Sequence, residues 1–175
     1  MDFLSRDGSP ISAELWSKID EQVISMAKKV LVGRRFLHIY GPLGAGVQSI
    51  NIDDSTQLAE TEGGIVQIKG RRYEQIPLLN QDFGLLWRDL ELSDKTGMPV
   101  DLSSALQASA TISKKEDELI FNGNKELGYE GLLTAKGVTK LKLSNWEEGE
   151  SPAKDITAGI TNLFDKGLVG RKALI

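Results

Sequence analysis

A polar stretch at residues 47–78 limits the ways in which this 175-residue chain can fold. Apolar residues alternate with polar ones at Ile50 and Ile52, and again between Ile65 and Ile68. This pattern is typical of two strands that leave the main fold as a long excursion. An isolated two-stranded ribbon is at best marginally stable in water. We therefore expect this ribbon to lie against another surface, and a neighbouring subunit is one candidate.

The two arms of the ribbon carry opposite charges. The first arm is acidic, whereas the second carries Lys69, Arg71 and Arg72. Three cations could contact phosphate, but 25 Asp and Glu against 21 Lys and Arg give the chain a formal net charge of −4. Such a balance does not favour nucleic acid. We predict instead that Lys69, Arg71 and Arg72 belong to a subunit interface, and we expect no nucleic-acid partner.

An amphipathic helix is expected from Ser12 to about Leu31. Ser12 can act as its N-cap, and apolar residues follow at three- and four-residue spacings through Val30. We expect Gly33 to adopt the left-handed conformation just beyond the helix end. The next residues, 36–40, alternate like a strand.

The middle of the chain combines strand-forming residues with a second helix. Residues 76–92 are rich in strand-forming and apolar side chains, so we expect them to return the chain to the core, with Trp87 buried. A helix of about four turns should follow and end at Gly123. Ser104 opens a Ser-x-x-Gln sequence typical of a capping box, and Asp101 is a rival cap.

The last part of the sequence carries patterns typical of a turn, short strands and one further helix. Residues 128–133 are expected to form a turn and a short strand. Ser151-Pro152 should open a third helix, which Gly167 closes. Residues 172–175 look like the beginning of a further strand. This order of elements indicates a mixed α+β fold.

Candidate catalytic and metal-binding residues are few. The single histidine, His38, stands in a chain with no Gly-x-Ser-x-Gly sequence and no cysteine. Acidic clusters at 116–118 and 147–150 offer oxygen atoms, but adjacent helix residues point about 100° apart and cannot all face one ion. We expect no metal site and no cofactor. We predict instead that Glu116 or Asp117 pairs with a cation from another segment.

The sequence also carries signals of cellular compartment. No apolar run reaches the length that spans a membrane, and the first eight residues lack the apolar block of a secretory signal. The absence of cysteine is compatible with the reducing cytoplasm. We therefore expect a cytoplasmic protein with no membrane partner.

Several stretches of the chain resemble the encapsulin shell proteins, a family also known as linocin-type bacteriocin proteins. The resemblance covers the whole chain, and its most specific part is the stretch at residues 100–104. It is carried by Met1-x-Phe3-Leu4, Trp16-x-x-Ile19-Asp20, Gly33-Arg34-Arg35-Phe36, Gly41-Pro42, Leu86-Trp87, Val100-Asp101-Leu102-Ser103-Ser104, Glu116-Asp117-Glu118-x-Ile120-Phe121-x-Gly123, Gly131-Leu132-Leu133 and Ser151-Pro152-x-Lys154-Asp155.

This resemblance implies the tailed-phage major capsid (Hong Kong 97-type) fold, an α+β fold in which many copies close into an icosahedral shell. In shells of this kind an extended loop lies along a neighbouring subunit. The resemblance maps residues 1–46 onto the N-terminal helix and the start of the peripheral domain, and residues 47–78 onto the extended loop. Residues 79–133 correspond to the peripheral domain with its spine helix, and residues 134–175 to a partial axial domain.

The function implied by the resemblance is that of a shell subunit and not of an enzyme. Family members assemble with copies of themselves and encapsulate iron-storage ferritin-like or peroxidase cargo. They bind a short C-terminal targeting peptide of the cargo on the inner wall, and the matching positions here include Val30, Arg34 and His38. Arg34 could hold a peptide carbonyl or carboxylate, or form a structural ion pair instead. Relatives often carry an acidic residue where this chain has His38.

The family's chains continue beyond the point that corresponds to Ile175. The resemblance therefore implies a member truncated at its C-terminus, with an incomplete fold and an exposed apolar face. An alternative is a non-assembling peptide-binding or interaction module that keeps the first helix. Old protease labels for relatives point to an enzyme, but a lone histidine argues against a hydrolase.

Overall fold

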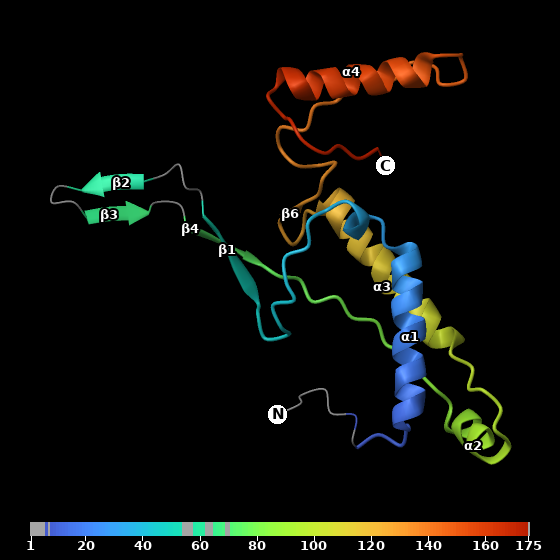
Figure 1. Cartoon of the computed structure of the whole chain (residues 1–175). Helices are drawn as coiled ribbons and strands as arrows, with labels where there is room; N and C mark the ends of the chain where they lie inside the picture. The colour runs from blue at the N-terminus through green and yellow to red at the C-terminus, as the bar shows by residue number, and fades with distance from the viewer. Residues whose placement is uncertain (1–5, 7, 54–57, 62–64, 69–70, 175) are drawn as a thin grey trace. The chain divides into compact units, whose positions relative to one another are not determined.

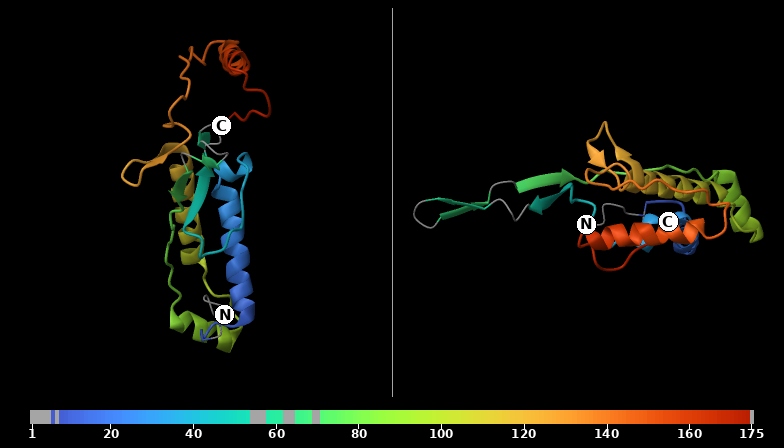
Figure 2. Two further views of the ribbon diagram at one scale, coloured as in Figure 1. Left: turned by 90° about the vertical axis from the view of Figure 1, so that its left-hand side faces the viewer. Right: turned by 90° about the horizontal axis from the view of Figure 1, so that it is seen from above.

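The computed structural model describes residues 6, 8–53, 58–61, 65–68 and 71–174. The chain divides into two compact units, Met1–Asp117 and Glu118–Ile175. Helices and two-stranded antiparallel sheets make up the regular structure of these units. Figure 1 labels these elements, and Figure 2 shows them from two further sides.

The helix α1, Ala13–Val30, begins where the sequence predicts. Ser12 is its N-cap, and the Ser12 hydroxyl oxygen accepts a 3.2 Å hydrogen bond from the backbone N–H of Leu15. Two lysines occupy the last turn, where the helix dipole favours positive charge. The predicted start and the predicted cap of this helix are therefore confirmed.

The chain leaves α1 differently from the prediction. Leu31 ends the helix in an extended conformation, and Gly33 opens a short 3-10 helix, η1 (Gly33–Arg35). The expectation of a left-handed Gly33 is wrong, because Gly33 is not among the described glycines with positive φ. The strand expected at residues 36–40 is also absent, and an irregular segment takes its place.

The predicted ribbon is confirmed. Strand β1, Ser49–Asp53, pairs antiparallel with β4, Arg71–Gln75. Strand β2, Leu58–Thr61, pairs antiparallel with β3, Ile65–Ile68. Each pair forms a separate two-stranded sheet with one-to-one register.

The segment after the ribbon does not form the buried strand that its composition predicts. Residues 77–86 are irregular, and helix α2, Trp87–Thr96, follows them. Trp87 is 67% exposed and Leu86 is 68% exposed, so the prediction of a buried Trp87 is wrong. The apolar side chains at the start of α2 are therefore left open to solvent in the single chain.

Helix α3, Ser103–Asn122, is longer than predicted and uses the rival cap. The Asp101 carboxylate accepts hydrogen bonds from the backbone N–H and the hydroxyl of Ser103, at 2.9 Å and 2.5 Å. These bonds lower the pKa of Asp101, the hydroxyl bond being the larger cause. The hydroxyl of Ser104 instead donates to the carbonyl oxygen of Gly84 at 2.9 Å. The capping-box prediction for Ser104 is wrong because its hydroxyl holds the preceding irregular segment.

Helices α1 and α3 meet through small side chains, and all views show them next to one another (Figures 1 and 2). Ala105 is 1% exposed and Ser113 is 2% exposed on the buried side of α3. The Ser109 hydroxyl donates a 2.8 Å hydrogen bond to the carbonyl oxygen of Val23 in α1. Small residues let two helices approach closely, because the axis separation depends on the side chains at the contact. This contact forms the core of the first unit, to which α1 contributes the buried Ile19.

The second unit contains a small hairpin. Strand β5, Gly123–Asn124, pairs with β6, Tyr129–Glu130. Gly123 has φ +69°, and a Cβ at this position would lie 2.3 Å from the carbonyl oxygen of Tyr129. Only glycine therefore fits at Gly123, where the backbone turns and another strand approaches closely. The predicted turn and short strand are confirmed.

Helix α4, Ser151–Asp165, carries proline in its first turn and ends before Gly167, as predicted, and Gly167 is left-handed. The described residues 172–174 form no strand, so that expectation is wrong for them, and Ile175 lies outside the described residues. No helix within the described part of the chain is both long and apolar enough to cross a membrane.

A larger side chain should not fit at Ala105, which is 1% exposed on α3. We predict that Ala105→Leu lowers the free energy of unfolding by about 1–3 kcal/mol, because overpacking displaces the groups that surround it. The same change at Ala110, which is only half-buried on α3, is the matched control and should have a smaller effect. Urea titrations followed by helical circular dichroism test the difference. Equal losses at Ala105 and Ala110 would contradict close packing around Ala105.

Candidate functional site

The segment that follows α1 is held by one carboxylate of α3. The Asp117 oxygens accept hydrogen bonds from the backbone N–H groups of Val32, at 2.8 Å, and of Gly33, at 2.9 Å. Asp117 is half-buried. Backbone N–H groups in such a place need an acceptor, because an unsatisfied donor away from water is costly. Asp117 therefore fixes the direction in which the chain leaves α1.

The neighbouring Glu116 binds Arg34 from the same segment. Arg34 Nε and Nη2 lie 2.6 Å and 2.8 Å from the two Glu116 carboxylate oxygens, which makes the pair bidentate. The hydrogen bond to Glu116 raises the pKa of Arg34, so the guanidinium stays charged. The prediction that this acidic pair takes a cation from another segment is confirmed. Of the two roles considered for Arg34, a contact with a peptide or a structural ion pair, the structure contains the ion pair.

A second arginine stabilises the end of α1. Arg35 Nη2 donates to the carbonyl oxygen of Lys29 at 2.9 Å and approaches that of Lys28 at 3.5 Å. The last carbonyl groups of a helix have no partners within the helix, and a cation suits the negative end of its dipole. Sequence reasoning missed this contact, although an arginine shortly after a helix is the expected signal for it.

The three positions predicted to bind a cargo peptide lie along this segment but do not form one helix face. Val30 is the last residue of α1 and is half-buried. Arg34 belongs to η1, and its side chain is 54% exposed. His38 is exposed in the irregular segment after η1. Their peptide-binding role stays a prediction.

The predicted interface cations of the ribbon are only partly described. Arg72 in β4 is 72% exposed and lies 3.8 Å from Glu74, a loose contact between neighbours on one strand. Arg71 pairs with Asp53 through the backbone, and its side chain lies outside the described residues. Lys69 lies outside the described residues altogether. Their role in a subunit interface stays a prediction.

Large apolar side chains stand open to solvent in both units. Those of the first unit that are more than half exposed are Ile24, Ile39, Tyr40, Tyr73, Leu78, Leu86, Trp87, Leu92 and Met98. In the described part of the second unit no large apolar side chain is fully buried. Single exposed apolar residues are normal, but this many indicate apolar surfaces that the described residues leave uncovered.

The second unit also contains a polar cluster that sequence reasoning missed. Asp155 accepts 2.8 Å hydrogen bonds from the backbone N–H and the hydroxyl of Ser144, and a 2.9 Å bond from the indole N–H of Trp146. These bonds lower the pKa of Asp155, the backbone N–H of Ser144 being the largest cause. The cluster closes one side of a mainly apolar cavity of about 660 Å³ next to α4.

The acidic side chains of the described residues form no metal-binding cluster. No group of three or more His, Cys, Asp and Glu side chains among them could hold a metal ion. Glu116 and Asp117, the strongest acidic candidates, are engaged with Arg34 and with the backbone after α1. What this arrangement does is hold the segment after α1 against α3.

Removing the Asp117 carboxylate should destabilise the folded state, because it leaves the backbone N–H groups of Val32 and Gly33 without their acceptor. We predict that Asp117→Ala lowers the free energy of unfolding by about 1–3 kcal/mol. Glu118→Ala removes the same charge from an exposed neighbour and should change it little. Urea titration of both variants provides the measurement. A loss no larger in Asp117→Ala than in Glu118→Ala would show that the backbone contacts are dispensable.

Comparison with known proteins places the chain in a family. The family model described as "Encapsulating protein for peroxidase" matches residues 1–175. A type 1 encapsulin shell protein of Myxococcus xanthus is 38% identical over 99% of this chain and 63% of its own length. A diheme-cytochrome–encapsulin shell fusion protein of Kuenenia stuttgartiensis is 40% identical over 94% of this chain and 47% of its own. The chain thus spans less than two thirds of the length of these relatives.

A solved structure confirms the predicted fold. The virus-like particle protein of Pyrococcus furiosus superposes with a TM-score of 0.60 and 24% identity, over 87% of this chain and 56% of that chain. This likeness supports the expected capsid-type α+β fold, in which α3 corresponds to the predicted spine helix. On the full-length family match and the identity to the shell proteins, the chain belongs to the family of encapsulating proteins for peroxidase.

Proposed function

We propose that this chain is a shell subunit of an encapsulin nanocompartment in the cytoplasm, which assembles with copies of itself into an icosahedral cage around cargo enzymes. Membership of the encapsulating-protein family over residues 1–175 carries the proposal. The four segments 1–46, 47–78, 79–133 and 134–175 are the proposed parts of the shell fold. We assign the chain no catalytic residue, metal or cofactor.

The pairing of the ribbon supports assembly. Ile50 and Ile52 lie on one face of β1, opposite Glu74 and Arg72 of β4. Ile52 is 40% exposed, although an isoleucine in a stable sheet normally packs against another surface. A ribbon of two strands gains little stability by itself. Burial of this face against a neighbouring copy would supply the missing stabilisation, and Arg72 of β4 lies on the same face as Ile52.

We further propose that the C-terminal targeting peptide of a ferritin-like or peroxidase cargo binds next to the end of α1. Val30 would contact an apolar peptide side chain, and the exposed His38 would meet a polar one. Arg34 binds Glu116 through Nε and Nη2. Its remaining Nη1 is the group that would donate to a peptide carbonyl or carboxylate. The ion pair thus orients Arg34 for this contact.

Assembly should depend on the apolar face of the ribbon. We expect the chain to form large particles in light scattering and negative-stain microscopy. Ile52→Asp should shift the mass towards small species, because burying a carboxylate at the interface costs free energy that the cross-strand Arg72 offsets only in part. Asn51→Asp adds the same charge to the neighbouring position, which faces the other side of β1, and is the matched control.

Two outcomes would contradict the assembly proposal. Monomers for the unchanged chain would remove self-assembly as its function and leave the alternative of a non-assembling peptide-binding module. Equal particle masses for Ile52→Asp and Asn51→Asp would exclude the apolar ribbon face from the interface.

Cargo binding should depend on Val30. The probe is the C-terminal peptide of a ferritin-like or peroxidase protein encoded beside the shell gene, carrying a fluorophore for anisotropy measurements. Val30→Ser should raise its dissociation constant about tenfold, because an apolar contact is replaced by a hydroxyl. Lys29→Ser alters an exposed neighbour and should leave the affinity unchanged. Equal affinities for the two variants would argue against a peptide site at the end of α1.

A further inference from the structure

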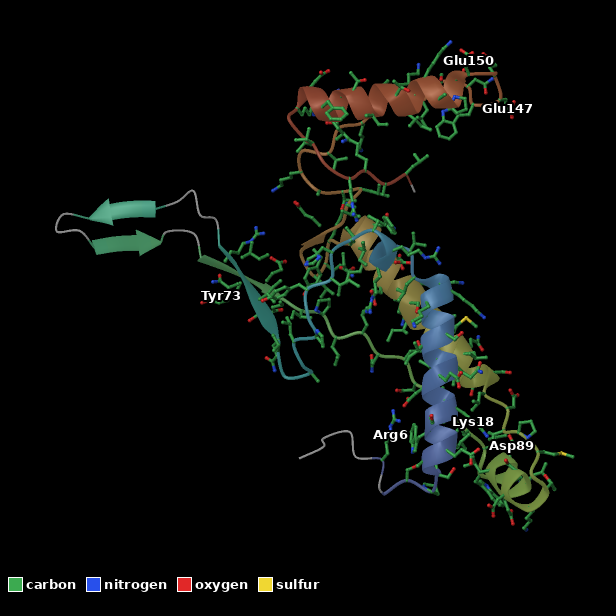
Figure 3. The ribbon with its side chains drawn as sticks, in the orientation of Figure 1. Arg6, Lys18, Tyr73, Asp89, Glu147 and Glu150 are labelled. Atoms are coloured by element: carbon green, nitrogen blue, oxygen red, sulfur yellow. The ribbon has the colours of Figure 1, made fainter. Side chains whose placement is uncertain are left out.

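Arg6 lies beside the first half of α1 (Figure 3). Its guanidinium carbon lies 4.3 Å from the centroid of the Trp16 ring. Its Nη1 and Nη2 lie 2.7 Å and 2.9 Å from the two Asp20 carboxylate oxygens. One side chain therefore stacks on an aromatic ring and forms a bidentate ion pair at the same time.

Trp16 and Asp20 have the geometry of a receptor for a flat cation. They lie four residues apart in α1, so they share one face of the helix. The ring face attracts a cation, and the carboxylate matches the two parallel N–H groups of a guanidinium. A lysine ammonium group has neither a flat surface to stack on the ring nor two parallel N–H groups for the carboxylate. Trp16 and Asp20 should therefore bind an arginine side chain more tightly than a lysine side chain.

The described segment before α1, Arg6 and residues 8–12, places Arg6 on this face. The carbonyl oxygen of Arg6 accepts a 3.0 Å hydrogen bond from the backbone N–H of Ser9. The Ser9 hydroxyl oxygen in turn accepts a 3.2 Å bond from the backbone N–H of Ile11. These turns connect directly to Ser12, the N-cap of α1. The segment is thus folded back onto the helix that follows it.

We propose that Trp16 and Asp20 form an arginine-binding site on α1, that Arg6 of the same chain occupies it, and that the segment before α1 is thereby a releasable strap. Release is accessible because the Arg6 and Asp20 side chains are each 46% exposed. Exposed ion pairs and exposed cation–π contacts each stabilise only weakly. The hydrogen bond from Arg6 also lowers the pKa of Asp20, as expected for an occupied pair.

Cleavage by trypsin after Arg6 measures release of the strap. Trypsin must take the Arg6 side chain into its own pocket, so cleavage requires that the contacts with Trp16 and Asp20 open. We expect Asp20→Asn to accelerate this cleavage about fivefold, since opening before cleavage tracks the released population. Lys18→Ala breaks an exposed ion pair with Glu14 on the same helix and is the matched control. Equal rates in Asp20→Asn and Lys18→Ala would overturn the strap.

Chemical rescue tests the preference for guanidinium. In a background with Trp87→Phe and Trp146→Phe, Trp16 is the remaining tryptophan of the three. Arg6→Ala should raise acrylamide quenching of its fluorescence, and N-acetyl-arginine amide at about 0.5 M, a concentration suited to two weak contacts, should reverse the rise. N-acetyl-lysine amide should not reverse it. Reversal by both amides, or by neither, would overturn the arginine-binding site.

A conservative variant protects the test against loss of folding. Arg6→Lys keeps the charge but lacks the planar fork, and it should raise the quenching of Trp16 to an intermediate level. Quenching equal to that of the parent would contradict the site. The proposal is independent of the proposed function, because Trp16 and Asp20 lie at least ten residues, or about 15 Å along α1, from Val30.

Discussion

Two adjacent carboxylates on α3 determine where the chain goes after its first helix. Asp117 accepts the backbone N–H groups of Val32 and Gly33, and Glu116 takes the guanidinium of Arg34. Adjacent helix residues point in different directions, so one of them binds backbone and the other a side chain. The contact joins residues more than 80 positions apart in sequence. Together with Arg35, which binds the last carbonyl groups of α1, this contact fixes the direction in which the chain leaves the helix.

The small residues between α1 and α3 complement this polar contact. Among the described residues, Ala105, Ala108, Ser109 and Ser113 are buried, and the large buried apolar side chains are Ile19 and Leu31. Burial of such small side chains removes little apolar surface from water. The described chain therefore leaves much apolar surface open, and the proposed assembly into a shell would cover such surface.

The sequence predicted what depends on local pattern. The cap at Ser12, the ribbon, the end of the third helix at Gly167 and the α+β class follow from spacing and turn chemistry, and the structure has them. It also predicted that Glu116 or Asp117 would pair with a cation, because an acidic residue interrupts an apolar stripe there.

The failures of sequence reasoning have one cause in common. Trp87 was expected in the core on hydrophobicity alone, but burial depends on which distant residues pack on a side chain, and Trp87 is 67% exposed. Gly33 was expected to be left-handed, but the Asp117 carboxylate supplies an acceptor that favours a 3-10 turn. The Ser104 hydroxyl donates to the carbonyl oxygen of Gly84. Each outcome depends on residues far away in sequence, so no local pattern reports it.

The one-to-one pairing of β1 with β4 also limits how this family can change length. Each residue from Ser49 to Asp53 has one partner between Gln75 and Arg71, with no bulge. Removing a single residue from β1 would turn Ile50 or Ile52 to the opposite face of the ribbon. Insertions and deletions within this pair should therefore persist in evolution only as matched changes on both strands, or as a bulge that absorbs the extra residue.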